Sequence, residues 1–305
     1  MMISKFLDPK NDVAFKKIFG TEKNKDILIH FLNDMITFRE KSPIQDVTFL
    51  KTIQDPEVAA KKTSIVDILC KDEKGNQYIV EMQVAKEKGF EKRAQYYACK
   101  AYVSQMVKKG QYEDLKEVIF LAMTDFEMFP NRKGYKSEHV ILDKETHEHH
   151  LKDFSFTFFE LPKFHKNMNE LENVEERWMY FFKHAEETSE KDLHTIIGSD
   201  EVIERAYEEL NRFSWNETEM RTYEQAEKHE WDQIAIMDQK FDEGLVVGIK
   251  KGIEKGREEE RAAGEKKRHT ERQETAKILL AQGVSIEIVA RATSLSKEEI
   301  QKLLS

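Results

Sequence analysis

The sequence has few cysteines, no long apolar run and no excess of positive charge, and each absence excludes a class of protein. Two cysteines in 305 residues, Cys70 and Cys99, provide neither a disulfide framework nor a set of zinc ligands. We expect both thiols to be reduced and mostly buried. No apolar run approaches the ~20 residues that a membrane helix needs, and the first residues lack the pattern of a secretory signal. The sequence therefore predicts a cytoplasmic protein with no membrane segment.

The net charge of −9 is unevenly distributed along the sequence. Residues 1–150 contain 25 Lys and Arg against 24 Asp and Glu, whereas residues 151–305 contain 24 against 34. All of the excess acid therefore lies in the second half. A nearly neutral first half still has basic side chains available for phosphate groups, so the charge does not exclude a nucleic acid partner.

Hydrophobic periodicity predicts a mixed α/β fold over roughly the first half of the chain. Helical spacing is followed by an alternating strand, a two-stranded hairpin with Gly75-Asn76 in its turn, a further helix and two more strands. The expected segments are helices over residues 8–36, a strand over 47–52, a hairpin over 61–84, a helix over 90–109, and strands over 118–123 and 154–161.

Strand patterns end near residue 174, and charged helical sequence follows. Residues 217–282 are expected to be almost continuous helix, in which Gly244, Gly248, Gly252 and Gly256 recur at four-residue steps. Such a row is compatible with a self-association surface or with a solvated, fraying helix, because glycine weakens helices. The pattern of residues 269–305 predicts short helices, with a capping box from Ser296 to Glu299. These helices are compatible with a protein-docking helical hairpin or with a DNA-binding element.

The predicted hairpin carries two acidic residues within otherwise apolar strands. Asp67 lies in the apolar run 65–69, and Glu81 and Gln83 lie in the run 79–84, where residues two apart point to the same face. A hairpin brings the two carboxylates close together, and buried carboxylates repel unless a cation joins them. Mg²⁺, which accepts one or two carboxylates together with water and phosphate, fits this pattern.

Four segments in this order resemble the Rpn family, the recombination-promoting nucleases that are also described as PD-(D/E)xK family transposases. They are DPKNDVAFKKIFG, VDILCKDEKGNQYIVEMQV, RAQYYACKAY and FTFFELPKF. The resemblance covers roughly residues 5–230. It implies a restriction-endonuclease-like core, with a mixed central sheet flanked by helices and followed by a long helical tail. The expected regions are a nuclease domain with a helical extension (1–229), a charged glycine-stepped helix or linker (230–268) and a small helical segment (269–305).

The resemblance implies that Asp67 and Glu81 are Mg²⁺ ligands in the hydrolysis of DNA. Gln83 stands where many relatives have lysine, and an amide can orient water but cannot act as a base. Asp12 matches an acidic position on the family's first helix and could complete the catalytic set. Its alternative role is that of a helix N-cap.

Lys16 could contact DNA, although a lysine pair such as Lys16 and Lys17 more often forms a solvated face, and the helix that follows the hairpin offers further candidates. Arg93 and Gln95 on this helix could reach phosphate, or could lie in solvent. Tyr97 shares a face with Arg93 and could either support such a contact or pack on the sheet.

These residues lead to two main hypotheses. The first is a Mg²⁺-dependent DNA endonuclease, which the resemblance associates with bacterial recombination, mobile elements or defence, and whose tail self-associates. The second is a scaffold that keeps the nuclease fold but binds partners or DNA instead of cleaving it. The presence of both acids favours the enzyme.

Overall fold

The computed structural model describes residues 4–37, 42–51, 66–107 and 110–303. The chain divides into two compact units, Met1–Ile234 and Ala235–Ser305. Among the described residues, every helix is either too short or too polar to cross a lipid bilayer.

The first unit is built on a mixed six-stranded sheet in the order β1-β2-β3-β4-β6-β5. Strands β3, β4 and β6 are parallel, whereas the pairs β1–β2, β2–β3 and β5–β6 are antiparallel. The strands are β1 (Val47–Phe49), β2 (Ile68–Asp72), β3 (Gln77–Gln83), β4 (Val118–Thr124), β5 (Lys136–Val140) and β6 (Phe154–Glu160). The predicted α/β class with a mixed sheet is confirmed.

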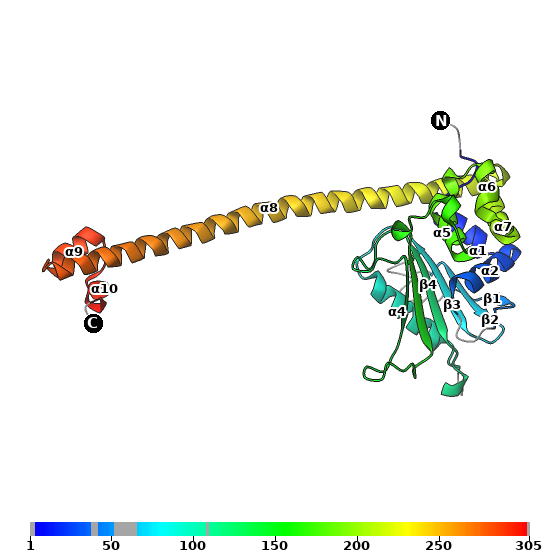
Figure 1. Ribbon diagram of the computed structural model, residues 1–305, viewed down its shortest axis with the longest axis horizontal. Helices are drawn as coiled ribbons and strands as arrows, with labels where there is room; N and C mark the ends of the chain where they lie inside the picture. Colours follow the sequence, from blue (N-terminus) through cyan, green and yellow to red (C-terminus); the bar gives the residue numbers. More distant parts are fainter. Residues whose placement is uncertain (1–3, 38–41, 52–65, 108–109, 304–305) are drawn as a thin grey trace. The chain divides into compact units, whose positions relative to one another are not determined.

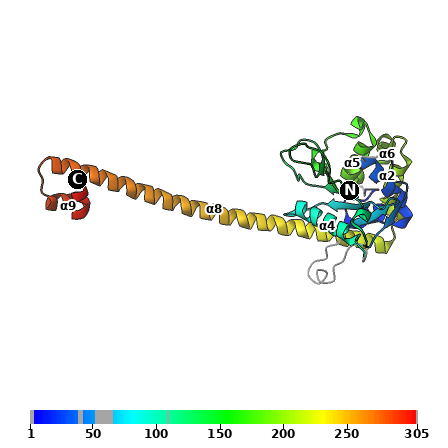
Figure 2. The same ribbon diagram turned by 90° about the horizontal axis from the view of Figure 1, so that it is seen from below.

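Helices cover both faces of this sheet (Figures 1 and 2). On one face, the sheet and the helices that precede and follow it in sequence form the larger core. On the other face, the sheet and α4 (Phe90–Ser104) form a smaller core. The helices of the larger core are α1 (Asp12–Phe19), α2 (Lys25–Met35), α5 (Val174–His184), α6 (Glu190–Ile197) and α7 (Glu201–Glu209). Strand β4 is buried along its whole length between the two cores, as its apolar sequence predicts.

Single 3₁₀ turns connect several of these elements. They are Glu22–Asn24, Tyr112–Asp114, Leu161–Lys163, Met168–Glu170, Ala185–Glu187 and Arg212–Ser214.

The predicted long helix is one uninterrupted element, α8 (Glu217–Ala281), as Figure 1 shows. In the second unit its last turns pack against α9 (Ile286–Thr293) and α10 (Lys297–Lys302) around Ala276, Val289 and Ile300. The predicted capping box is present, because the Ser296 side chain accepts from the Glu299 backbone N–H while the Glu299 carboxylate accepts from the Ser296 backbone.

Three sequence predictions need correction. Strand β5 was not expected, because its sequence KSEHV is polar and is held by pairing with β6 rather than by an apolar pattern of its own. The helix predicted over 90–109 ends at Ser104, and residues 108–109 lie outside the described residues. Cys70 is buried as expected, but Cys99 on α4 is exposed. The predicted start of the hairpin, residues 61–65, also lies outside the described residues.

Candidate active site

The two predicted acidic residues meet where β2 begins and β3 continues past it. Asp67 immediately precedes β2, and the pairing of Ile68 with Val80 places it next to Glu81 on β3. The backbone N–H of Met82 donates to Oδ2 of Asp67 at 2.9 Å. This bond fixes the Asp67 carboxylate against β3, so the hairpin brings the two acids together as the sequence predicts.

Both carboxylates lie in a largely dry environment. Strand residues alternate between faces, so Glu81 shares its face with Ile79, which belongs to the smaller core beneath α4. Glu81 is 4% exposed, and the Asp67 side chain is 14% exposed. The sheet and α4 therefore remove both acids from most of the water that would otherwise solvate their charges.

This environment disfavours two negative charges. Burial raises the pKa of Asp67, an effect that the hydrogen bond from the Met82 backbone only partly offsets. Burial, followed by the nearby Asp67 carboxylate, raises the pKa of Glu81 still further from its ordinary value. Desolvation and like charge act in the same direction here, so a nearby cation would favour the ionised form of both acids.

One oxygen of Glu81 is left without a hydrogen bond. Its Oε1 atom is buried and has no hydrogen-bond partner among the described residues. Its Oε2 atom lies 3.9 Å from a guanidinium nitrogen of Arg93 on α4, too far for a hydrogen bond. A buried acceptor in this condition costs free energy, and such atoms often mark a site for an ion or ligand.

Gln83 connects the acidic pair to α4. Its Oε1 atom accepts a hydrogen bond from the Arg93 guanidinium, and its Nε2 atom donates to the carbonyl oxygen of Ala85 at 2.9 Å. A second nitrogen of Arg93 contacts the Glu87 carboxylate at 2.5 Å. The sequence analysis did not identify Glu87, because it lies in the turn before α4 and no strand or helix period marks it.

Helix α1 adds Asp12 and Lys16 to the site. The Nζ atom of Lys16 lies 2.6 Å from Asp12 and 3.6 Å from Oδ1 of Asp67. Asp12 also contributes to the raised pKa of Asp67, after burial and the effects of Met82 and Lys16. The N-cap role considered for Asp12 is wrong, because the side chain of Asn11 caps α1 by accepting from the Val13 backbone at 3.0 Å.

Lys16 remains charged in this position. Burial by itself would lower the pKa of Lys16, but hydrogen bonding and attraction to Asp12, supported by Asp67, raise it overall. The structure thus places Lys16 beside the acidic pair. This proximity could not be predicted from the sequence, because it depends on how α1 packs against the sheet.

The other residues expected on α4 lie in different environments. Gln95 bonds its side-chain amide back to the carbonyl oxygen of Glu91 at 3.0 Å and faces solvent. Tyr97 is 8% exposed and belongs to the smaller core, and burial raises its pKa. Arg93 lies 3.9 Å from Glu81, and Tyr97 packs on the sheet close enough for the charges of Arg93 and Glu81 to affect its pKa.

A metal ion at this site would be held by few protein ligands. Across the described ranges, no group of three or more His, Cys, Asp or Glu side chains is placed to hold a metal. Mg²⁺ often takes only one or two carboxylates and completes its octahedron with water and substrate phosphate. Asp67 and the unpaired Oε1 of Glu81 fit that requirement.

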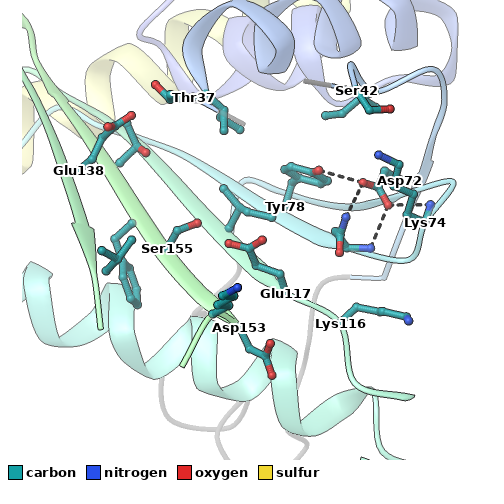
Figure 3. A pocket seen from close by; sticks show the side chains of 18 of the residues that line it. Thr37, Ser42, Asp72, Lys74, Tyr78, Lys116, Glu117, Glu138, Asp153 and Ser155 are labelled. Carbon is teal, nitrogen blue, oxygen red and sulfur yellow. Dashed lines mark hydrogen bonds between the residues drawn. The ribbon is translucent and has the colours of Figure 1, made fainter. Parts of the chain in front are cut away.

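A cavity of about 710 Å³ lies elsewhere on the sheet (Figure 3). Its lining includes Asp72, Tyr78, Glu117 and Asp153, which belong to the β2–β3 turn and to the starts of the parallel strands or the residues just before them. Neither Asp67 nor Glu81 lines it. The cavity is therefore separate from the acidic pair.

The sequence was also compared with known protein families. The sequence model of the PD-(D/E)XK nuclease family transposases matches residues 9–240, which include both acids, Gln83 and all of the strands and helices of the sheet domain. No curated protein and no solved structure matches the chain.

Proposed function

We propose that this chain, which belongs to the PD-(D/E)XK nuclease family transposases, is a Mg²⁺-dependent endonuclease that hydrolyses phosphodiester bonds in DNA. The observation that carries the proposal is the unpaired, buried Oε1 atom of Glu81 beside Asp67. The Arg93 guanidinium lies 3.9 Å from Oε2 of Glu81, beyond hydrogen-bond distance. This pair is left to be neutralised by something that binds.

Asp67 and Glu81 would hold the metal. Two buried oxygens of like charge match a hard divalent cation, and both raised pKa values imply that binding displaces protons. When bound, Mg²⁺ supplies Lewis acidity toward the scissile phosphate and lowers the pKa of a coordinated water.

Gln83 and Arg93 would organise the substrate side of the site. Hydrogen bonds with Arg93 and with the Ala85 carbonyl hold both ends of the Gln83 amide. The fixed side-chain oxygen of Gln83 could therefore orient a water molecule. Arg93 lies between Gln83, Glu81 and Glu87. It could turn a guanidinium nitrogen toward a phosphate oxygen and offset charge in the transition state.

Lys16 would supply a second positive charge, from the α1 side. It lies within 3.6 Å of Asp67, and its raised pKa keeps it protonated. Because Gln83 carries no charge, Lys16 could supply the positive charge that binds a phosphate group at this site. Asp12 would hold this ammonium group in place through their 2.6 Å contact. Gln95 is exposed and could contact DNA outside the reacting phosphate, whereas Tyr97 would support α4.

The biological setting proposed for this activity is DNA recombination, mobile-element movement or defence in bacteria, in the cytoplasm. The family's description as transposases supports this setting.

The test is cleavage of supercoiled plasmid by the purified full-length protein with Mg²⁺. Glu81→Gln and Asp67→Asn should each lower the rate by about 10²–10³-fold, the usual effect of removing one transition-state contact. Glu91→Gln, an exposed change on the same helix as Arg93, should leave the rate unaltered. EDTA should stop cleavage, and circular dichroism should show that every variant is folded.

Equal cleavage by wild type and both acid variants would assign the activity to a contaminant and remove the site. No cleavage by folded wild type with either Mg²⁺ or Mn²⁺ would favour the scaffold hypothesis.

A further inference from the structure

A row of large apolar side chains lies exposed along α8 in the second unit. The row comprises Met237, Phe241, Leu245, Ile249 and Ile253, which are 39–71% exposed. They recur every four residues and therefore form one continuous ridge along the helix surface. Exposed apolar patches with a charged surround mark interaction surfaces.

The neighbouring row is made of glycine. Gly244, Gly248 and Gly252 each precede a member of the apolar row by one residue, and Gly256 continues the series. A Cβ atom added at any of the four would meet no heavy atom within 4 Å. Among the described residues, nothing within one chain therefore requires glycine here, although glycine weakens a helix relative to alanine. A groove free of side chains thus runs beside the apolar ridge.

Ridge and groove are complementary to each other in shape. When two helices pack through their four-residue rows, the ridge of each lies in the groove of the other and the axes cross at about −50°. A twofold axis satisfies both contacts at once, because each copy supplies one ridge and one groove. A second copy of the same helix is therefore an occupant that fits this surface.

The charges at the two ends of this helix segment distinguish a parallel pair of helices from an antiparallel pair. Residues 236–243 contain three acids and one lysine, whereas residues 250–257 contain four basic residues and one acid. A parallel pair would place like charges beside each other at both ends. An antiparallel pair centred between Val246 and Val247 places the acidic end of each copy beside the basic end of the other, which is favourable.

We propose that the chain forms a homodimer through residues 236–257 of α8, in antiparallel orientation, with the apolar row of each copy against the glycine row of the other. This inference does not rest on the nuclease proposal, because none of the residues involved belongs to the acidic site.

Sedimentation equilibrium of the full-length protein tests the dimer. Wild type should be dimeric, and Gly248→Leu should weaken dimerisation at least tenfold by filling the groove. This variant is informative because leucine favours helix over glycine, so helicity should be kept or increased while association is lost. Gly264→Leu is the matched control, since it makes the same change outside the apolar row and should leave the dimer intact. A wild-type monomer, or equal association of the two variants, would overturn the proposal.

Spin-label distances test the orientation in a Cys99→Ser background, where buried Cys70 stays unlabelled. Glu260 lies 13.5 residues from the proposed centre. Labels at Glu260→Cys in the two copies should therefore be about 40 Å apart at a rise of 1.5 Å per residue. A parallel pair would bring them within about 20 Å, because packed helix axes lie 8–10 Å apart. Val246→Cys should give a short distance in the dimer. A short distance at Glu260 would overturn the antiparallel arrangement.

Discussion

Two acidic residues of the same hairpin differ in how the chain satisfies them. Asp72 accepts hydrogen bonds from the backbone of Lys74 and Asn76, from the Asn76 amide and from the Tyr78 hydroxyl, all at 2.9–3.0 Å (Figure 3). Glu81, nine residues later, keeps a buried oxygen with no hydrogen-bond partner in the described chain. The first carboxylate is a structural element of the turn. The second keeps an unsatisfied oxygen, which is where we propose that a metal ion binds.

Burial alone does not make this distinction. Glu160 is completely buried, and one of its oxygens also has no hydrogen-bond partner among the described residues. Its other oxygen, however, accepts from the backbone of Met128 and Phe129 and contacts the Lys163 ammonium at 2.7 Å. Glu160 therefore has a buried cation of its own. The pair formed by Asp67 and Glu81 has Lys16 and Arg93 only at 3.6 and 3.9 Å.

The largest expected effect is on stability. Replacing the carboxylate by an amide should destabilise the protein at Asp72 and stabilise it at Glu81. In metal-free protein at pH 8, Asp72→Asn should lower the free energy of unfolding by about 1–3 kcal/mol, because the two donors to one of its oxygens lose their acceptor. Glu81→Gln should raise the free energy of unfolding, on the order of 1–3 kcal/mol, because it removes a buried charge. Urea denaturation measures both.

The sign of the Glu81 effect depends on pH. The pKa of Glu81 is raised in the folded protein, so the fold holds a proton that the unfolded chain releases. Wild-type stability therefore falls as pH rises from the ordinary carboxyl range through the raised pKa. At pH 4 the advantage of Glu81→Gln should disappear. An advantage that stays constant from pH 4 to pH 8 would contradict the assignment.

The next effect is the response to metal. Mg²⁺ at one hundred times its dissociation constant should raise the free energy of unfolding of wild type by about 2.7 kcal/mol. Asp72→Asn should gain the same amount from its lower starting point, whereas Glu81→Gln should gain almost nothing. Calorimetry at pH 7 should also detect proton release on binding to wild type. An equal gain by Glu81→Gln would place the metal elsewhere.

The smallest effect contrasts two polar residues of α4. Arg93→Ala should lower plasmid cleavage by about 10–100-fold, the range typical of a residue that supports metal ligands. Gln95→Ala should change it less than about threefold, because the Gln95 side chain bonds only within its own helix in the described structure. Initial rates at saturating Mg²⁺ measure both. Equal losses would show that α4 binds DNA along its exposed face as well.

The sequence predicted the part of the site that depends on local pattern. Asp67 and Glu81 interrupt apolar strands on either side of a Gly75-Asn76 turn, and strand alternation places them on one face. The long helix was also predictable, because a charged helical pattern continues without proline through 217–281. These features need no knowledge of distant contacts.

The remainder depends on contacts that no local sequence pattern marks. Lys16 reaches Asp67 only because α1 docks beside the start of β2. Glu87 becomes a partner of Arg93 through the turn that precedes α4. Strand β5 has a polar sequence and takes its conformation from β6. In each case the sequence near the residue gives no periodic signal, so the contact could not be predicted.

The turn closed by Asp72 also sets the length of the β2–β3 loop, and the position of Glu81 beside Asp67 depends on that length. One residue inserted between Asp72 and Gln77 would shift the pairing of the two strands by one position, and such a slip moves every following side chain to the opposite face of the sheet. Glu81 would then point into the larger core while the sequence of the motif stayed intact. A one-residue insertion in the turn would therefore separate Glu81 from Asp67 and remove the proposed metal site, without changing either acid.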